Sequence, residues 1–186
     1  MGTVLSVNDI GGGTDLYDSI NGSAAFRSNG SFSLSRFSFA SPISYYENFV
    51  SDYCPSHYRE VHQQEEDGIL TVTALPFIKD LPVYSASIDF VFEENALTTV
   101  SGYFMPSSEG SAQATSSISK CSAVVSLMDY CHAEGHICNQ ITGLSTGYLL
   151  QSTVSIPLLL SPVYKIDTNM SSYYVNVSTG HVFPTK

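Results

Sequence analysis

The sequence predicts an α+β protein made of two tandem units, each with one helix and an antiparallel sheet. The first observation is an internal echo: LPVY at 81–84 and SPVY at 161–164 each open a β-rich stretch that ends near a glycine. The second is that a helix-like segment precedes each stretch. The third is that long crossovers between strands are missing, which disfavours parallel pairing. A repeat of this length indicates a duplicated unit, not a solenoid.

These patterns divide the 186 residues into four parts. Residues 1–24 are rich in Gly, Ser, Asn and Asp, and they predict a flexible N-terminal linker. The first helix-plus-sheet unit is expected over 25–105, a loop over 106–116, and the second unit over 117–186.

The first helix is expected to begin at Ser41, whose hydroxyl can accept from the free amides of a first turn, with Pro42 following. Apolar residues recur at helical spacing as far as Tyr53, and Pro55 marks the end. Asn29-Gly30, between alternating apolar residues, predicts a hairpin. Glu94-Asn95 predicts a second one.

The second helix is expected from about Ser117 to Ala133, with Gly135 as its stop. One face of it is predicted to be apolar: Ile118, Cys121, Val125 and Met128, widened by Val124 and Leu127. Strands are expected to follow over 137–142, 148–154, 158–167 and 173–183.

The charge of the chain excludes one class of partner. The net charge is −10, and the seven Lys and Arg residues are scattered singly. Nucleic acid requires clustered cations, so it is not expected as a partner, and anionic lipid is disfavoured. No apolar run approaches the length of a membrane helix. Membrane attachment is therefore expected only through a segment absent from this chain.

The four cysteines allow several states. The cysteines are Cys54, Cys121, Cys131 and Cys138. They can form two disulfides, in one of three possible pairings, or they can be buried thiols. Cys131 and Cys138 are the first pair to consider, because a tight turn separates them. Together with His132 and His136 they are also four potential zinc ligands. Their spacing matches no common finger, so neither a metal site nor a cofactor is expected.

One catalytic motif requires attention. Residues 143–147 (GLSTG) fit the Gly-x-Ser-x-Gly pattern, and Asp167 and His181 follow in the order of a hydrolase triad. The nucleophile elbow needs a helix after the serine, whereas the residues after Gly147 predict a strand. The chain is therefore expected not to be an enzyme. A small serine hydrolase using Ser145, Asp167 and His181 is the alternative.

Two segments of the second half resemble a known family. Residues 160–166 (LSPVYKI) and 173–182 (YYVNVSTGHV) are similar to the strand and the closing hairpin of PepSY-like domains. They also resemble the extracytoplasmic regions of YycH/YycI-type regulators of bacterial two-component systems. The resemblance covers roughly 117–183 and, more weakly, 41–104.

The resemblance implies a PepSY-like duplication and a non-enzymatic regulatory module. Such a module would lie at the outer face of the bacterial cytoplasmic membrane and would be membrane-tethered in the full-length protein. Its expected partner is a sensor kinase, a protease or a component of the cell envelope. The resemblance carries over no catalytic, metal or binding residues, so the binding site is unknown at this point.

Overall fold

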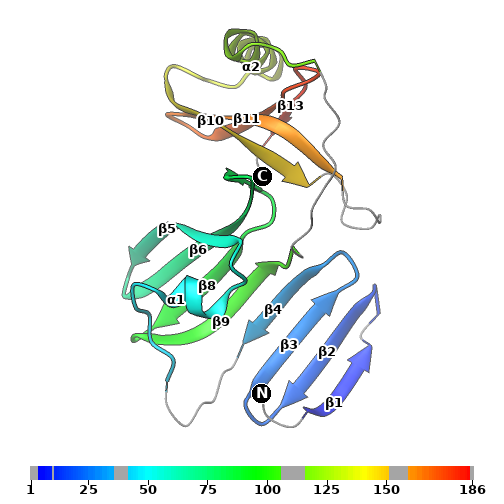
Figure 1. The fold of residues 1–186 in the computed structure, drawn as a ribbon, viewed down its shortest axis with the longest axis vertical. Coiled ribbons are helices and arrows are strands. Elements are labelled where there is room, and N and C mark those ends of the chain that lie inside the picture. Colours follow the sequence, from blue (N-terminus) through cyan, green and yellow to red (C-terminus); the bar gives the residue numbers. More distant parts are fainter. Residues whose placement is uncertain (1–3, 10, 36–41, 106–115, 151–158, 185–186) are drawn as a thin grey trace. The chain divides into compact units, whose positions relative to one another are not determined.

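The computed structural model describes residues 4–9, 11–35, 42–105, 116–150 and 159–184. They form two compact units (Figure 1). The first unit comprises the described residues up to 105, and the second comprises those from 116 onward. Each unit has an apolar core of its own. Within these ranges, no helix is both long enough and apolar enough to cross a membrane.

The first unit is built on an antiparallel sheet that has nine strands among the described residues. In chain order they are β1 (Val4–Asp9), β2 (Thr14–Ser19), β3 (Gly22–Arg27), β4 (Ser31–Ser35), β5 (Tyr58–Glu66), β6 (Ile69–Ile78), β7 (Leu81–Pro82), β8 (Ile88–Glu93) and β9 (Ala96–Tyr103). The order across the sheet is β1-β2-β3-β4-β9-β8-β6-β5, and β7 pairs with β6.

The flexible linker predicted over 1–24 is wrong where the structure describes it, because β1, β2 and the start of β3 lie there. The residues that predicted a linker are the turns of two hairpins. Thr14 N donates to Gly11 O at 3.2 Å in the first turn, and Asn21 N donates to Ser19 Oγ at 3.1 Å in the second. Turn residues and linker residues have the same composition, so composition alone could not separate them.

The hairpin predicted at Asn29-Gly30 is confirmed, since β3 and β4 pair on either side of it. Asn29 Oδ1 accepts from Ser31 N at 2.9 Å, and Gly30 has a φ of 86°. The loop predicted over 106–116 lies outside the described residues except for Ser116. The predicted unit boundaries at 25–105 and 117–186 stay predictions.

The first helix is much shorter than its sequence spacing predicts. Helix α1 spans Phe49–Tyr53, while the start predicted at Ser41 lies outside the described residues. The segment from Pro42 to Glu47 is not helical. Its backbone is held by tertiary pairing instead: Leu97 N, in β9, donates to Ile43 O at 2.8 Å. Ile43 therefore reaches the core from a non-helical segment, whereas Phe49 and Val50 reach it from the short helix.

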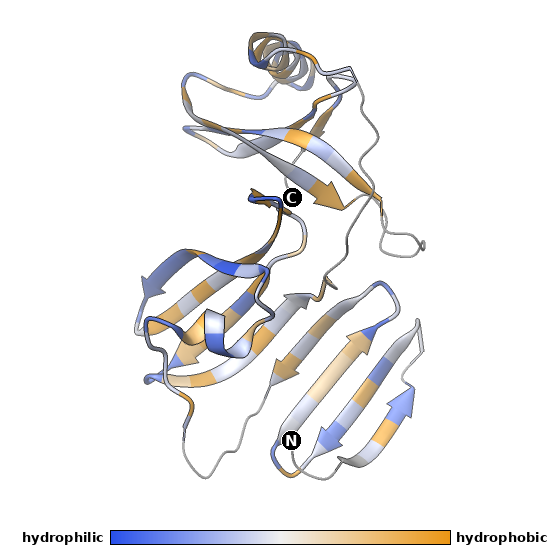
Figure 2. Ribbon diagram, viewed as in Figure 1, coloured by the Kyte–Doolittle hydropathy of each residue, from blue (hydrophilic) through white to orange (hydrophobic). Residues whose placement is uncertain are grey.

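One face of the first sheet is covered and apolar. Phe49 and Val50 of α1 lie against Val72, Phe90 and Phe92 in a single core cluster. Figure 2 shows the consequence along the central strands, where hydrophobic and more polar residues alternate. Alternate side chains of a strand point to opposite faces, so the other half of each strand faces away from this core.

The second unit places one helix over a smaller antiparallel sheet. Helix α2 (Lys120–Glu134) precedes β10 (Ile141–Leu150), β11 (Leu160–Thr168), β12 (Ser172–Asn176) and β13 (Val182–Pro184), which pair in that order. The Ser119 hydroxyl caps the helix by accepting from Ser122 N at 3.0 Å. The stop predicted at Gly135 is confirmed, because this residue is the left-handed C-cap with a φ of 70°.

The predicted apolar face of α2 is confirmed for Leu127 and Val124, which contribute to the core, and is wrong for Val125 and Met128. Ala123, Leu127 and Cys131 are the buried residues of this helix, whereas Val125 and Met128 are 56% and 62% exposed. Both sets have helical spacing, so periodicity alone could not choose between them. Packing against Ile166 and Val175 of the sheet determines which face of the helix is buried.

The prediction of two tandem helix-plus-sheet units is also wrong, and with it the PepSY-like duplication. The described chain is mostly antiparallel sheet, and the two units differ in size and topology. The echoed segments do not occupy equivalent places. Leu81–Pro82 forms the short β7 beside β6, whereas residues 161–164 lie inside β11, between β10 and β12. A shared strand-like tetrapeptide was therefore not a sign of a shared unit.

Candidate functional site

A row of short polar side chains crosses the uncovered face of the first sheet. Ser33 pairs with Ser101, Ser101 with Asp89, and Asp89 with Thr73. Thr73 in turn pairs with His62 on β5. Because directly paired residues share a face, these five side chains form one line across β4, β9, β8, β6 and β5. We call this line the hydroxyl row.

The row lies opposite the core because of strand alternation. Its neighbours in sequence, such as Phe32, Phe90 and Val72, point to the face that α1 covers. Ser33, Ser101, Asp89 and Thr73 are only partly buried. The row is therefore open in the described part of the first unit.

Internal hydrogen bonds hold parts of this face in place. Thr73 Oγ1 donates to Asp89 Oδ1 at 2.7 Å. Beyond Ser33 along β4, the hydroxyl of Ser35 lies 3.3 Å from the hydroxyl of Ser23 on β3. Fixed hydroxyl and carboxylate groups lose less conformational freedom when a ligand binds than flexible side chains do.

A hollow of about 490 Å³ adjoins the end of the row formed by Ser33 and Ser101. Its walls include Arg27, Ser31, Ser33, Ser87, Ser101 and Tyr103. Burial raises the pKa of the Tyr103 phenol, so this side chain stays an uncharged donor at neutral pH.

Two glycines shape the wall beside Tyr103. A Cβ on Gly30 would lie 2.6 Å from Cε2 of the Tyr103 ring, which shows that the ring packs directly on the β3–β4 turn. A Cβ on Gly102 would come closer still to the carbonyl oxygen of Ser87 and would lie 2.7 Å from Ile88 Cα. Both positions require glycine because of their positive φ and lack of space.

The site has groups suited to binding more than to bond-breaking. Hydroxyls donate and accept, Asp89 only accepts when ionised, and Arg27 only donates. Such a mixture matches a ligand that carries many hydroxyls. The hollow has one guanidinium, that of Arg27, which cannot neutralise a polyanionic ligand. The net charge of −10 would also repel such a ligand.

The serine, aspartate and histidine of the hydrolase alternative do not come together. Ser145 lies within strand β10 opposite Lys165, so the residues 143–147 form no strand-to-helix elbow. Asp167 is level with Ser172 on β12, whereas His181 O accepts from Asn176 N. Four residues of strand, or roughly 13 Å, separate those levels. The geometry of a triad is therefore absent from these three residues.

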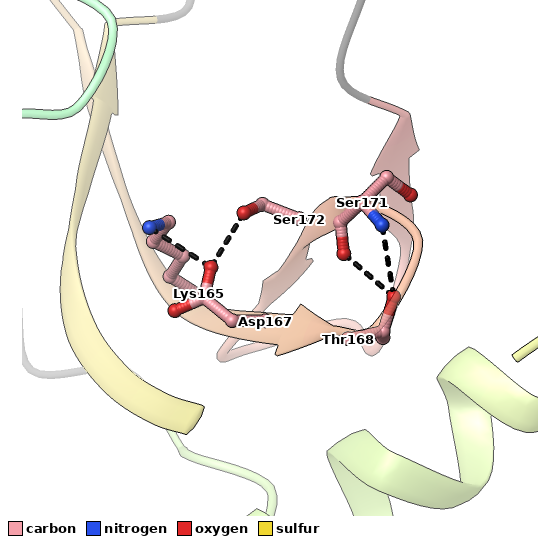
Figure 3. Close-up of polar contacts among 5 residues, drawn as sticks. All are labelled: Lys165, Asp167, Thr168, Ser171 and Ser172. Atoms are coloured by element: carbon pink, nitrogen blue, oxygen red, sulfur yellow. Dashed lines mark hydrogen bonds and ion pairs between the residues drawn. The ribbon is translucent and has the colours of Figure 1, made fainter. Parts of the chain in front are cut away.

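Asp167 is instead part of a structural polar cluster (Figure 3). Lys165 Nζ lies 2.9 Å from Asp167 Oδ1, and the Ser172 hydroxyl donates to the same carboxylate. The neighbouring turn is closed by Thr168, whose hydroxyl donates to Ser171 O at 2.7 Å. Burial acts to raise the pKa of Asp167, but the Ser172 hydrogen bond and the Lys165 charge outweigh it and lower the pKa.

Replacing Asp167 with asparagine should remove a pH-dependent part of stability. Because the folded pKa is depressed, this part is present above the ordinary aspartate value of 3.8 and is lost as pH falls through the folded pKa. The side chain is 34% exposed, so we expect an effect below about 1 kcal/mol. Urea unfolding at pH 6 and pH 3 measures it: the difference between wild type and Asp167→Asn should shrink at the lower pH. Lys165→Met should weaken the same dependence, and a pH-independent difference would contradict the assignment.

The cysteine and histidine cluster does not form a metal site in the described residues, where no group of three or more potential ligands gathers. His132 is exposed on α2. His136 Nδ1 shares a hydrogen bond with the Tyr173 hydroxyl at 3.2 Å.

Sequence reasoning missed the hydroxyl row, although a signal for it exists. Ser31, Ser33 and Ser35 alternate with Phe32 and Leu34. Thr71 and Thr73 alternate with apolar residues in the same way. Period-two hydroxyls in several strands predict a polar sheet face. The sequence does not say that these strands are neighbours in register.

Comparisons with known proteins give a fold and no family. No family model matches the chain, and no curated protein matches it. Among solved structures, the chain is similar to the C-terminal domain of YpeB from Bacillus megaterium, with a TM-score of 0.50 and 9% sequence identity. The match covers 97% of this chain and 88% of the YpeB chain. The likeness supports a PepSY-like fold, but not the YycH/YycI type specifically.

Proposed function

We propose that this chain is a non-enzymatic binding domain that acts outside the cytoplasmic membrane and binds a neutral glycan of the cell envelope. The hydroxyl row, with its adjoining hollow, is the proposed binding surface. The observation that carries the proposal is the register that brings Ser33, Ser101, Asp89 and Thr73 into one open line. The fold likeness to the YpeB domain is compatible with this role, as is attachment to the membrane through a segment outside this chain.

Charge favours a glycan over other envelope polymers. The protein is strongly acidic, so an anionic polymer would be repelled at low salt. A neutral sugar chain offers hydroxyls that pair with serine, threonine and carboxylate groups without any need for opposite charge. Binding of this kind should depend little on ionic strength.

Sedimentation with insoluble chitin, an uncharged polymer of N-acetylglucosamine, tests the proposal. We expect the wild-type chain to sediment with chitin equally at low and high salt. Ser33→Gln and Ser101→Gln place bulk on the hydroxyl row and should weaken binding about tenfold or more, as expected when buried hydrogen bonds are lost. Ser51→Gln is the matched control, because Ser51 is exposed on α1 in the same unit.

Three outcomes would count against the proposal. Retention that disappears at high salt would indicate charge-driven adsorption. Equal losses for Ser101→Gln and Ser51→Gln would remove the hydroxyl row as the surface. Failure to sediment, with specific recovery of an envelope protein in a pull-down, would replace the glycan with a protein partner such as a protease or a sensor kinase.

A further inference from the structure

Two thiols meet where α2 ends. Cys131 lies in the last turn of the helix and is 4% exposed, and Cys138 packs against the same core. The two side chains therefore share one core cluster, and, after desolvation by burial, the neighbouring Cys138 is among the causes that raise the pKa of the Cys131 thiol. A disulfide between them requires Cβ atoms that approach to about 3.5–4.5 Å.

The helix cap explains why these thiols come together. The N–H groups of Gly135 and His136 both donate to Cys131 O, the latter at 2.8 Å. These two hydrogen bonds to one carbonyl oxygen reverse the chain in the manner of a Schellman motif. The segment after the helix is thereby folded back over the last turn, and Cys138 is carried to the side of the helix that bears Cys131. The His136–Tyr173 hydrogen bond anchors the reversed segment to β12.

We propose that Cys131 and Cys138 are a disulfide site that is oxidised by a small-molecule disulfide and then clamps the end of α2 to the segment leading into β10. This inference is independent of the proposed glycan binding, because it concerns the second unit only.

The other two cysteines are not placed to form an alternative disulfide with Cys131. Cys54 packs against the core of the first unit. Cys121 is exposed near the start of α2, and ten residues of helix, or roughly 15 Å, separate it from Cys131. Among the described cysteines of the second unit, Cys131 and Cys138 are therefore the two that share its core.

The reaction consists of two thiol–disulfide exchanges. The thiolate of Cys138, the more accessible of the pair, attacks one sulfur of the oxidant and expels one thiolate, which leaves a mixed disulfide. Cys131 then gives up its proton, attacks the Cys138 sulfur and expels the second thiolate. One oxidant disulfide is reduced to two thiols, and the two protein thiols become one disulfide.

The order of attack follows from burial. Desolvation and the neighbouring Cys138 raise the pKa of the Cys131 thiol, against a hydrogen bond with Tyr173 that lowers it. A buried thiol with a raised pKa is a poor first nucleophile towards a molecule in solution. It can still react with a mixed disulfide formed beside it.

Peptide mapping of the full chain tests the site. The folded protein is incubated with oxidised and reduced glutathione, quenched in acid, alkylated and digested with chymotrypsin without reduction. Cleavage after Tyr130 yields a peptide that begins at Cys131, contains Cys138 and excludes Cys121. We expect this peptide to lack both alkyl groups and to be lighter than the reduced form by two hydrogen atoms.

Variants separate this bond from general oxidation. Cys121→Ser should leave the linked peptide unchanged, whereas Cys138→Ser should leave Cys131 alkylated. Oxidation should raise the thermal midpoint of the second unit by roughly 5–10 °C in wild type and Cys121→Ser, and not in Cys138→Ser. Recovery of both thiols alkylated, or as separate glutathione adducts, would overturn the proposal. So would a linked peptide that forms only after denaturation.

Discussion

Replacing Gly102 with alanine should destabilise the first unit by roughly 2–5 kcal/mol. Gly102 has a φ of 151°, in a region that only glycine adopts readily. A Cβ there would also lie 2.7 Å from Ile88 Cα and still closer to the Ser87 carbonyl oxygen. Both obstacles are backbone atoms of the adjacent β8 segment, so no side-chain rotation relieves the clash. The sheet must shift between β8 and β9, beside the proposed binding hollow.

Gly68→Ala is the matched control for this prediction. Gly68 also has a positive φ, 78°, but an added Cβ there would meet no atom within 4 Å. It should cost only about 1 kcal/mol, the backbone preference alone. Urea unfolding followed by circular dichroism compares the two variants. Equal losses would show that β8 and β9 are not packed as closely as described.

Local signals predicted the extent of the second helix well but not its full buried face, and they predicted the first helix poorly. The stop of α2 at Gly135 depends on the backbone freedom of one residue, which the sequence states directly. Around α1, Ile43 has helical spacing with Tyr46 and Phe49, but Ile43 reaches the core from a non-helical segment whose backbone pairs with Leu97. That pairing joins residues more than fifty positions apart, so it lies beyond the reach of local periodicity.

The candidate site depends on the same kind of long-range information. The alternation of Ser31, Ser33 and Ser35 was visible in the sequence as a polar half of a strand. This polar half becomes part of a continuous row only because β4 lies beside β9 in the sheet. Four other strands separate β4 from β9 along the chain. The GLSTG motif failed for the complementary reason, because a catalytic elbow is defined by the turn around the serine and Ser145 lies within a regular strand.

Truncation of Phe49 to alanine should remove about 3–5 kcal/mol from the stability of the first unit. Phe49 is 1% exposed, and its ring meets Phe90 and Phe92 edge-to-face at centroid distances of 5.2 and 5.1 Å. Helix α1 has five residues, too few to be stable by itself in water. The helix therefore exists because Phe49 packs on the sheet, and its loss should release α1 as well as leave a cavity.

Tyr53→Ala provides the contrast, because Tyr53 stacks on Phe49 at 4.7 Å yet is 56% exposed. It should cost much less than Phe49→Ala, since most of its surface already contacts water. Hydrogen exchange resolves where each variant acts. In Phe49→Ala the amides of Asp52 and Cys54, which donate to Asn48 O and Val50 O, should lose protection, while peptides of α2 keep theirs. Because Phe49 belongs to the first core and Leu127 to the second, a parallel loss over α2 would mean that the two cores unfold together.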